Sequence, residues 1–547
     1  MMQLTDHAFV NTLIKTFEDS GLDFARAYYL FATARLEKTY NSADIYQNYP
    51  MLQDEATFQR LKPLYDVHPD NEEIKRLFVS ALGSYIGNAL AKESDELTNL
   101  KNDLKIDVSG LNITDKTGQI LESVLYEDTP ELFKRIAEKP TREALYERVA
   151  KTYTREITPK FVDLFHKENK LMADLGYADL INFYSQTSGH NLPGLGKIAQ
   201  SLVTQTDNLY QKTISPFYQK RTGHDFKDAT RADIAYVFHG KSEEMAHIDA
   251  RFPQEKLVTL ATQTFDSMGL DFSTMARPVD FPDKDEYLKT VTDPERSYRI
   301  LLDVATREGK RSRAYVYPAR APEEIYLSVK PEGGLDDFSA FFHESGHAQH
   351  FAYVQPGLSY PLALMGNNTV TESYAYLMQN LFLNHHWLVN QAGLTASEAS
   401  QAIRRSALND LYMLRRYASK MQFELKLYDG KPLDGKAEIY AELLTRGTGF
   451  KYDAEGWSRD VDAGFYVADY FTAWTLEAQL REYLQTHYGS AETHGEDWYQ
   501  NAQAGAFLKS LWWDGNLTQQ DLSARLGYNE PNDIGPLLRL MQQNLNR

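Results

Sequence analysis

Two histidines and a glutamate stand at a spacing that suits metal-assisted hydrolysis. The stretch 336–354, DDFSAFFHESGHAQHFAYV, contains His343, Glu344 and His347 in the pattern H-E-x-x-H. Residues four apart lie on one face of a helix, so both imidazoles can reach a single tetrahedral cation. Glu344 lies one step round that helix, near enough to take a proton from an activated water. The pattern therefore predicts half of a zinc site and its general base.

The third protein ligand must come from elsewhere in the chain. A third histidine six residues after His347 is excluded, because that position is Tyr353. In the fifty residues after His347, Glu372 is the only carboxylate. It opens an apolar segment of helical period, which Thr369 or Thr371 could cap. A lone acid in such a segment is costly to bury unless a cation pairs with it, so we expect Glu372 to complete the site.

Three further histidines compete for the same role. His350 falls on nearly the same helix face as His343, seven residues earlier. We expect it to line or support the site, and binding of the metal itself is the alternative. His385 and His386, in NHHW, are expected at a helix end.

The segments around the site are mostly of helical period. Apolar residues recur three and four apart in segments 72–104, 141–177, 407–430, 436–446, 468–489 and 534–547. Segment 297–334 differs, because short β-branched and aromatic runs are cut by Gly, Pro and charge, and it predicts two or three strands of a small sheet. Such a sheet, directly before the histidine-rich helix, either offers its edge to an extended peptide or simply caps a helical lobe.

Composition narrows the classes of protein. The 547 residues carry a net charge of -18, which argues against a nucleic-acid partner. With no cysteine, disulfides and thiolate chemistry are excluded, and a metal must be held by His, Asp or Glu. The chain lacks a long apolar run and its first residues lack a basic signal-like region, so we expect a cytoplasmic protein without a membrane partner. The oligomeric state is left open.

These motifs resemble the thimet oligopeptidase and oligoendopeptidase F family of zinc metallopeptidases. The resemblance rests on HESGHAQH, on TESYAYLMQNL 25 residues further on, and on the lead-in REGKRSRAYVYP followed by GGLDDFSAFFHE. It also includes LMADLGYADLINFYSQTSG and covers about residue 150 to the C-terminus. We therefore expect a helical N-terminal region at 1–150 and a catalytic region at 151–547. Within it lie the HExxH helix near 338–354, the third-ligand helix near 370–384 and a Tyr-rich segment at 457–475.

The resemblance implies a mostly α fold, a two-lobed helical ellipsoid with a deep channel and a small sheet beside the zinc helix. It also implies one zinc ion per chain, held by His343, His347 and Glu372, with Glu344 as base and short peptides as substrates. In the segment GFYVADY, Tyr470 and then Tyr466 match the family's oxyanion donors. His350 is expected to line the substrate site. Arg459 stands where the family usually has a histidine, and an arginine there could bind a substrate carbonyl or carboxylate.

The leading hypothesis is a zinc-dependent endopeptidase for short, unstructured peptides. A carboxypeptidase or dipeptidase on the same site is one alternative. A helical binding protein with a vestigial site is another, and the intact His, Glu, His and Glu positions argue against it.

Overall fold

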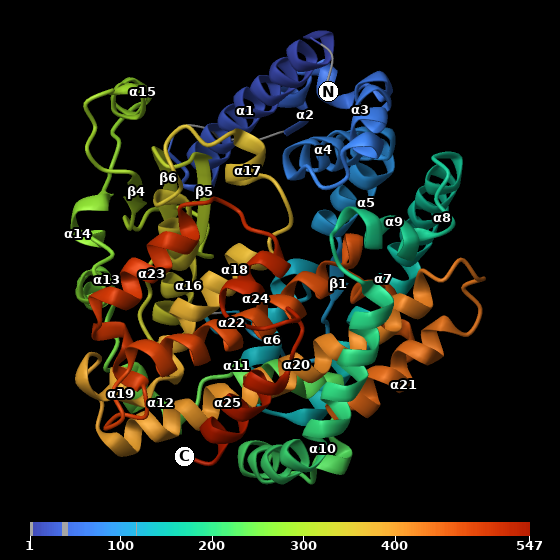
Figure 1. Cartoon of the computed structure of the whole chain (residues 1–547). Coiled ribbons are helices and arrows are strands. Elements are labelled where there is room, and N and C mark those ends of the chain that lie inside the picture. Colours follow the sequence, from blue (N-terminus) through green and yellow to red (C-terminus); the bar gives the residue numbers. More distant parts are fainter. Residues whose placement is uncertain (1–3, 36–41, 116) are drawn as a thin grey trace. The chain divides into compact units, whose positions relative to one another are not determined.

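The computed structural model describes residues 4–35, 42–115 and 117–547, and these are mostly α-helical (Figure 1). The mostly α fold class is confirmed. The described chain forms two compact units that are interleaved along the sequence. Unit 1 comprises residues 1–85, 247–403 and 472–537, and unit 2 comprises 86–246, 404–471 and 538–547. The boundary expected near residue 150 lies inside helix α7 of unit 2, away from every division between the units.

The helices divide between these units. Those of unit 1 are α1 (Leu4–Ala32), α2 (Ser42–Tyr46), α3 (Glu55–Val67), α13 (Leu257–Ser267), α14 (Phe272–Met275), α15 (Lys284–Thr292), α16 (Leu335–Ala352), α17 (Tyr360–Leu364), α18 (Thr369–Gln379), α19 (His385–Asn390), α23 (Ala502–Trp512) and α24 (Gln519–Arg525). Those of unit 2 are α5 (Ala91–Asp103), α6 (Thr129–Arg135), α7 (Lys139–Glu156), α8 (Thr158–Asp174), α9 (Leu180–Thr187), α10 (Leu192–Thr222), α11 (Ile234–His239) and α21 (Lys436–Thr448). Five helices contribute residues to both units: α4 (Glu72–Ala89), α12 (Glu243–Asp249), α20 (Ala396–Leu427), α22 (Tyr466–Tyr488) and α25 (Gly535–Leu545).

The predicted helical segments are helices in the structure, with two interruptions. Segment 72–104 breaks at Leu90 into α4 and α5. Segment 141–177 breaks at Ile157 into α7 and α8, where Pro159 follows in the first turn of the new helix. Proline is tolerated in a first turn because its missing N–H has no partner there, so the break at this point has a local cause. None of the described helices combines the length and hydropathy needed to span a bilayer.

The small sheet of unit 1 has four strands in the order β3 (Ala276–Pro278), β4 (Ile300–Asp303), β6 (Glu324–Ser328) and β5 (Tyr315–Arg320). Strands β3, β4 and β6 run parallel, and β5 is antiparallel to β6. Segment 297–334, which was predicted to form two or three strands, forms three of them, and β3 adds a fourth. The central strands β4 and β6 are buried throughout, whereas β5 lies at one edge of the sheet. A second sheet, in unit 2, pairs β1 (Lys105–Asp107) with β2 (Ser123–Leu125).

Two helices cover the edge strand. Tyr315 and Tyr317 of β5 pack against Tyr28 of α1, with ring centroids 5.5 and 4.9 Å apart. Successive residues of a strand face opposite sides, so Val316 faces away from α1. Helix α16 packs against β5 and β6. The edge strand thus lies directly beside the helix that carries the H-E-x-x-H motif.

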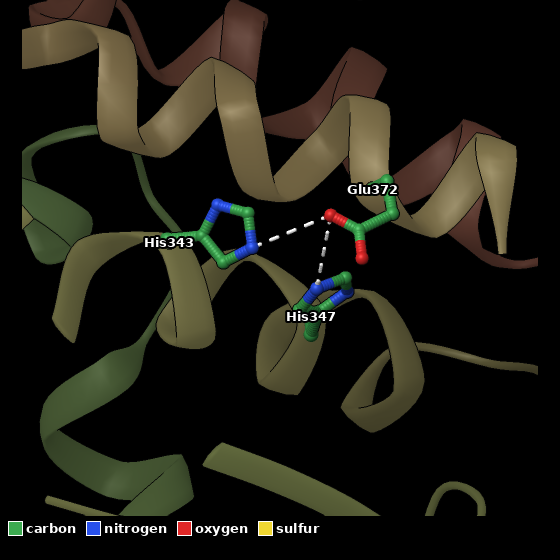
Figure 2. Close-up of side chains that lie close together, drawn as sticks. All are labelled: His343, His347 and Glu372. Atoms are coloured by element: carbon green, nitrogen blue, oxygen red, sulfur yellow. Dashed lines mark ion pairs between the residues drawn. The ribbon is translucent and has the colours of Figure 1, made fainter. Parts of the chain in front are cut away.

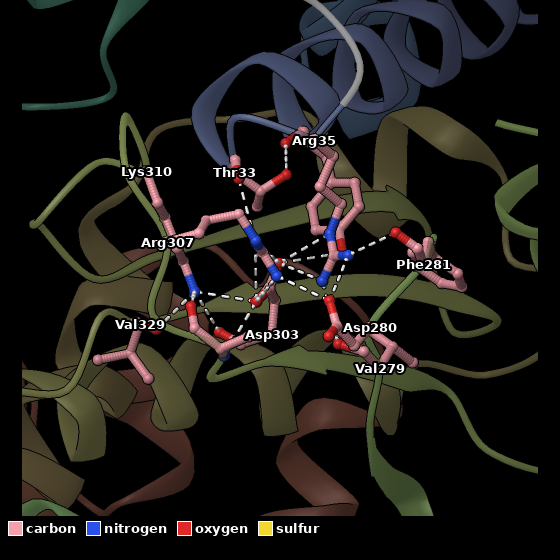
Figure 3. A network of polar contacts seen from close by, with 11 residues as sticks. Thr33, Arg35, Val279, Asp280, Phe281, Asp303, Arg307, Lys310 and Val329 are labelled. Carbon is pink, nitrogen blue, oxygen red and sulfur yellow. Dashed lines mark hydrogen bonds and ion pairs between the residues drawn. The ribbon is translucent and has the colours of Figure 1, made fainter. Parts of the chain in front are cut away.

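A buried acid at the end of β4 ties α1 to this sheet (Figure 3). The Asp303 carboxylate accepts hydrogen bonds from Arg35, Arg307 and Lys310 at 2.8, 3.0 and 2.9 Å. The Lys310 ammonium also donates to the backbone carbonyls of Ala305 and Val329, at 3.0 and 2.7 Å. Burial opposes ionisation of Asp303, but Lys310 and Arg35 outweigh it and lower the pKa of this carboxyl group. The network therefore holds the loop between β4 and β5 in place.

We expect Asp303→Asn to lower the free energy of unfolding by about 3–5 kcal/mol, because the three cations would lose a buried partner. The matched control is Asp280→Asn. Asp280 binds Arg35 and Arg307 as well, but its side chain is 73% exposed, so its loss should cost less than about 1 kcal/mol. Urea unfolding measures both variants. Because the pKa of Asp303 is lowered on folding, its contribution is present at neutral pH and fades below about pH 4, so the gap between wild type and Asp303→Asn should narrow there.

Candidate metal centre

The two histidines of the motif lie one turn apart on α16 and face the same point (Figure 2). Their ring centroids are 5.1 Å apart. The helix is apolar on its buried side, where Phe338, Phe341 and Phe342 are fully buried. His343 and His347 keep 18% and 13% of their side-chain surface exposed, so a small solute can still reach them.

Glu372 completes the group from the next long helix, α18 (Figure 2). Its Oε2 lies 3.4 Å from His343 Nε2 and 3.8 Å from His347 Nε2. Zinc bonds to N and O ligands are about 2.0–2.2 Å long, which at a tetrahedral angle separates two ligand atoms by roughly 3.3–3.6 Å. The buried Oε2 makes no hydrogen bond within the described residues, a costly state that a cation would relieve. The three residues therefore fit a zinc ion.

The approach of α18 to α16 depends on one glycine. A Cβ placed on Gly346 would lie 2.7 Å from both Ala375 Cα and Tyr374 O. Real Cβ atoms do not come so close to a backbone, so only glycine lets the helices pack at this distance. Gly346 directly precedes His347, and Ala375 lies one turn after Glu372. The close contact therefore sets the distance between Glu372 on α18 and the two histidines on α16.

Each of the two histidines is held through its Nδ1 atom. His343 Nδ1 lies 2.8 Å from Gln379 Oε1, and His347 Nδ1 lies 2.8 Å from the Thr371 hydroxyl. Partners of this kind orient a metal-binding imidazole and select its tautomer. Burial lowers the pKa of His347 to about 3, so this ring is neutral at neutral pH. Burial also disfavours the charged form of His343, but Glu372 outweighs this and raises its pKa.

Glu344 is suited to exchange a proton near neutral pH. Burial, assisted by the negative charge of Glu372, raises the pKa of Glu344 to about 7 in spite of the nearby His343 and Arg313. The backbone of Val316, in the edge strand β5, lies close to the Glu344 carboxylate and also opposes this rise in pKa. The edge strand thus lies beside the carboxylate that α16 presents next to His343 and Glu372.

His350 is fully buried, and both of its ring nitrogens contact protein atoms. Its Nδ1 lies 3.1 Å from the Thr371 hydroxyl and its Nε2 lies 3.1 Å from the carbonyl oxygen of Gly515. The expectation that His350 lines the substrate site therefore conflicts with its burial. Its ring instead contacts Thr371, the residue that contacts His347. His385 and His386 stand in the first turn of α19, at the helix end where they were expected.

The remaining predicted residues belong to unit 2. Tyr466 and Tyr470 lie on the first turns of α22, with ring centroids 4.7 Å apart, and both are partly exposed. Tyr470 also stacks on Tyr417 of α20 at 5.6 Å. The Arg459 guanidinium packs over the ring of Tyr146, 5.0 Å from its centroid. The Tyr146 ring thus makes a cation–π contact with Arg459.

Two of the residues that build the site escaped the sequence analysis, and a third was misread. Thr371 was considered as a helix cap, but α18 begins at Thr369 and the Thr371 hydroxyl contacts two histidines instead. Gln379 and the Val316 N–H were not foreseen at all. Gln379 lies seven residues after Glu372, which places it two turns further along the same face of α18, and this spacing was the available signal.

A helix that presents two imidazoles and a glutamate, with a carboxylate from a following helix, defines a metallopeptidase type of zinc site. Comparison with protein families agrees. The model of peptidase family M3 matches residues 132–500, which is more than half of the 547-residue chain. The chain therefore belongs to peptidase family M3, whose members are zinc metallopeptidases that act on peptide bonds. A search of curated proteins finds no match.

We expect Gly346→Ala to destabilise the protein by about 1–3 kcal/mol, because the added methyl group must push α16 away from α18. The same shift should weaken zinc binding. Gly83→Ala is the matched control, since Gly83 is an exposed helical glycine with no atom within 4 Å of the added Cβ. Helix propensity predicts that this control is neutral or slightly more stable than wild type. Thermal unfolding of the zinc-free protein measures both, and equal melting temperatures would contradict the packing argument.

Proposed function

We propose that this protein is a zinc-dependent oligopeptidase that cleaves short, unstructured peptides at internal bonds. One zinc ion per chain would be held by His343, His347 and Glu372, and Glu344 would be the general base. The observation that carries the proposal is the convergence of three ligand atoms, all within 4.8 Å of one another, beside a glutamate whose pKa is raised to about 7.

Zinc and Glu344 would have separate roles in the proposed hydrolysis. When bound, zinc supplies a Lewis acid that polarises the scissile carbonyl and makes water a better nucleophile at neutral pH. Glu344 takes the proton of the attacking water and delivers it to the leaving amine. The backbone of Val316 lies beside the carboxylate that makes both transfers. A pKa of about 7 suits a group that must accept and then release one proton.

The edge strand β5 offers a way to bind the peptide. Among the described residues it has a strand neighbour on one side only, and an extended peptide can add to such an edge through backbone hydrogen bonds. Because Val316 of this strand contacts Glu344, a peptide laid along the edge would pass close to the base. The preference for short, unstructured peptides, and the channel that would enforce it, rest on the family resemblance.

We further assign the oxyanion to a tyrosine of α22, with Tyr470 preferred over Tyr466. A phenol O–H aimed at the developing negative charge stabilises the transition state more than the substrate. Arg459 would contact a substrate carbonyl or carboxylate, with its guanidinium steadied by the Tyr146 ring. His350 is left out of substrate binding because it is fully buried.

We expect Glu344→Gln to lower kcat by about two to four orders of magnitude while the protein still binds zinc, because only the base is removed. The control is Asp336→Asn, which makes the same change of charge at an exposed position of the same helix and should leave turnover unchanged. The measurements are zinc content by atomic spectroscopy and cleavage of a quenched fluorescent peptide blocked at both ends. A blocked peptide has no free terminus for an exopeptidase, so its cleavage also tests the endopeptidase mode.

Three outcomes would each reject part of the proposal. Full turnover in Glu344→Gln would show that Glu344 is not the general base. Cleavage of free peptides but not of blocked ones would favour a carboxypeptidase or dipeptidase. Zinc bound by the wild type without any turnover would favour a binding protein with a vestigial site.

Replacement of the oxyanion donor should have a different signature. We expect Tyr470→Phe to lower kcat by about two to three orders of magnitude with little change in KM, since the hydroxyl acts in the transition state. Tyr466→Phe is the paired variant, because it removes a hydroxyl from the neighbouring ring, and it should have the smaller effect. The reverse order would assign the role to Tyr466.

A further inference from the structure

A chain of three hydrogen bonds runs from a metal ligand into the protein interior. His347 Nδ1 lies 2.8 Å from Thr371 Oγ1, which lies 3.1 Å from His350 Nδ1. His350 Nε2 in turn lies 3.1 Å from the backbone carbonyl of Gly515, in the loop between α23 and α24. Thr371 and His350 are buried, and all four residues belong to unit 1. The zinc chemistry proposed above uses neither Thr371 nor His350.

The chemistry of the last acceptor gives this chain one direction. A carbonyl oxygen can only accept, so the Nε2 of His350 carries the proton. In a neutral imidazole the other nitrogen is then an acceptor, and the Thr371 hydroxyl must donate to it. The Thr371 oxygen is left to accept from His347, which places the proton of His347 on Nδ1. The lone pair of His347 is therefore on Nε2, the atom that faces Glu372.

The backbone carbonyl at the end of this chain of hydrogen bonds cannot easily move. Gly515 has a φ of 76°, and a Cβ there would lie 2.5 Å from the carbonyl oxygen of Leu362. The next residue, Asn516, donates its backbone N–H to the same carbonyl at 2.9 Å and receives a hydrogen bond from Arg76 at 2.5 Å. The carbonyl of Gly515 is thus fixed by its surroundings, and so is the polarity of the chain that ends on it.

We propose that Thr371 and His350 are positioning residues that hold His347 in the metal-binding tautomer and so set the affinity for zinc. This inference rests on the proposed function, since it takes His347 as a zinc ligand. Without the chain, a buried imidazole can carry its proton on Nε2 instead, and zinc must then displace it. Loss of such a partner typically costs 10–100-fold in metal affinity.

The test compares Thr371→Val with Thr371→Ser. Valine has nearly the shape of threonine but neither donates nor accepts, so zinc affinity should fall by about 10–100-fold. Serine keeps the hydroxyl and should stay within about threefold of wild type. Affinity is measured on the zinc-free protein by competition with a chromophoric chelator. Thermal unfolding of the same zinc-free samples shows that each variant is folded before zinc is added.

A second variant tests the direction of the chain and replaces the first if Thr371→Val does not fold. In His350→Leu the Thr371 hydroxyl loses its acceptor and can turn to donate to His347 Nδ1, which favours the tautomer that carries its proton on Nε2. Zinc affinity should again fall by about tenfold or more although Thr371 is intact. Unchanged affinity in a folded Thr371→Val or His350→Leu protein would overturn the proposal.

Failure of the proposed function has a distinct signature. In that case His347→Ala would bind zinc as tightly as wild type, or wild type would bind none. If only the chain of hydrogen bonds is unimportant, His347→Ala loses zinc while Thr371→Val and His350→Leu keep it.

Discussion

The contact between α16 and α18 at Gly346 is the constraint on which the rest of the site depends. Ligands from two helices can meet one cation only if the helix backbones approach closely, and a side chain at residue 346 would prevent this. The contact also buries the Glu372 carboxylate, whose Oε2 makes no hydrogen bond within the described residues and faces the Nε2 atoms of His343 and His347. A buried carboxylate is costly unless a positive charge lies beside it, so the packing of the two helices favours a cation at this point.

The same dry environment acts in opposite directions on the two kinds of titratable group. It favours the neutral form of each, so it raises the pKa of Glu344 and lowers that of His347. A neutral imidazole is the form that binds a metal, and a glutamate that titrates near neutral pH is the form that shuttles a proton. One physical cause therefore suits both residues to their proposed roles, His347 as a metal ligand and Glu344 as the base. Polar contacts from Gln379, Thr371 and Val316 then add the orientation that burial alone cannot supply.

Much of this centre could be predicted from the sequence, because it depends on spacing along helices. His343 and His347 are separated by one turn, and Glu372 is the one acid of an apolar segment. The helical segments, apart from the breaks at Leu90 and Ile157, and the strands of segment 297–334 also follow from local pattern. The contacts of Thr371 with His350, and of Val316 with Glu344, could not be predicted, because they join segments whose distance in space depends on the packing of α16. The interleaving of the two units could not be predicted either, because no linker or shift in composition marks their boundaries.

The backbone that leads into the tyrosine segment of unit 2 is strained, and the residues packed around it hold it in that conformation. Gly464 and Phe465 both have positive φ, at 68° and 57°, directly before α22 begins at Tyr466. For a bulky aromatic residue this conformation costs about 1–3 kcal/mol, and it persists only where the surroundings enforce it. Here the Phe465 ring is buried, with the rings of Tyr428 and Tyr184 at 4.9 and 5.9 Å.

Charged residues spaced along α20 complete this restraint. Lys420 forms an ion pair with Asp462 at 2.5 Å, and one turn further along, Glu424 accepts the Asp462 backbone N–H at 2.9 Å. Arg416, one turn earlier, pairs with Asp460. Three successive turns of α20 thus make polar contacts with the loop that leads into α22. The direction in which Tyr466 and Tyr470 leave that loop is therefore decided by a rigid helix rather than by the loop's own preferences.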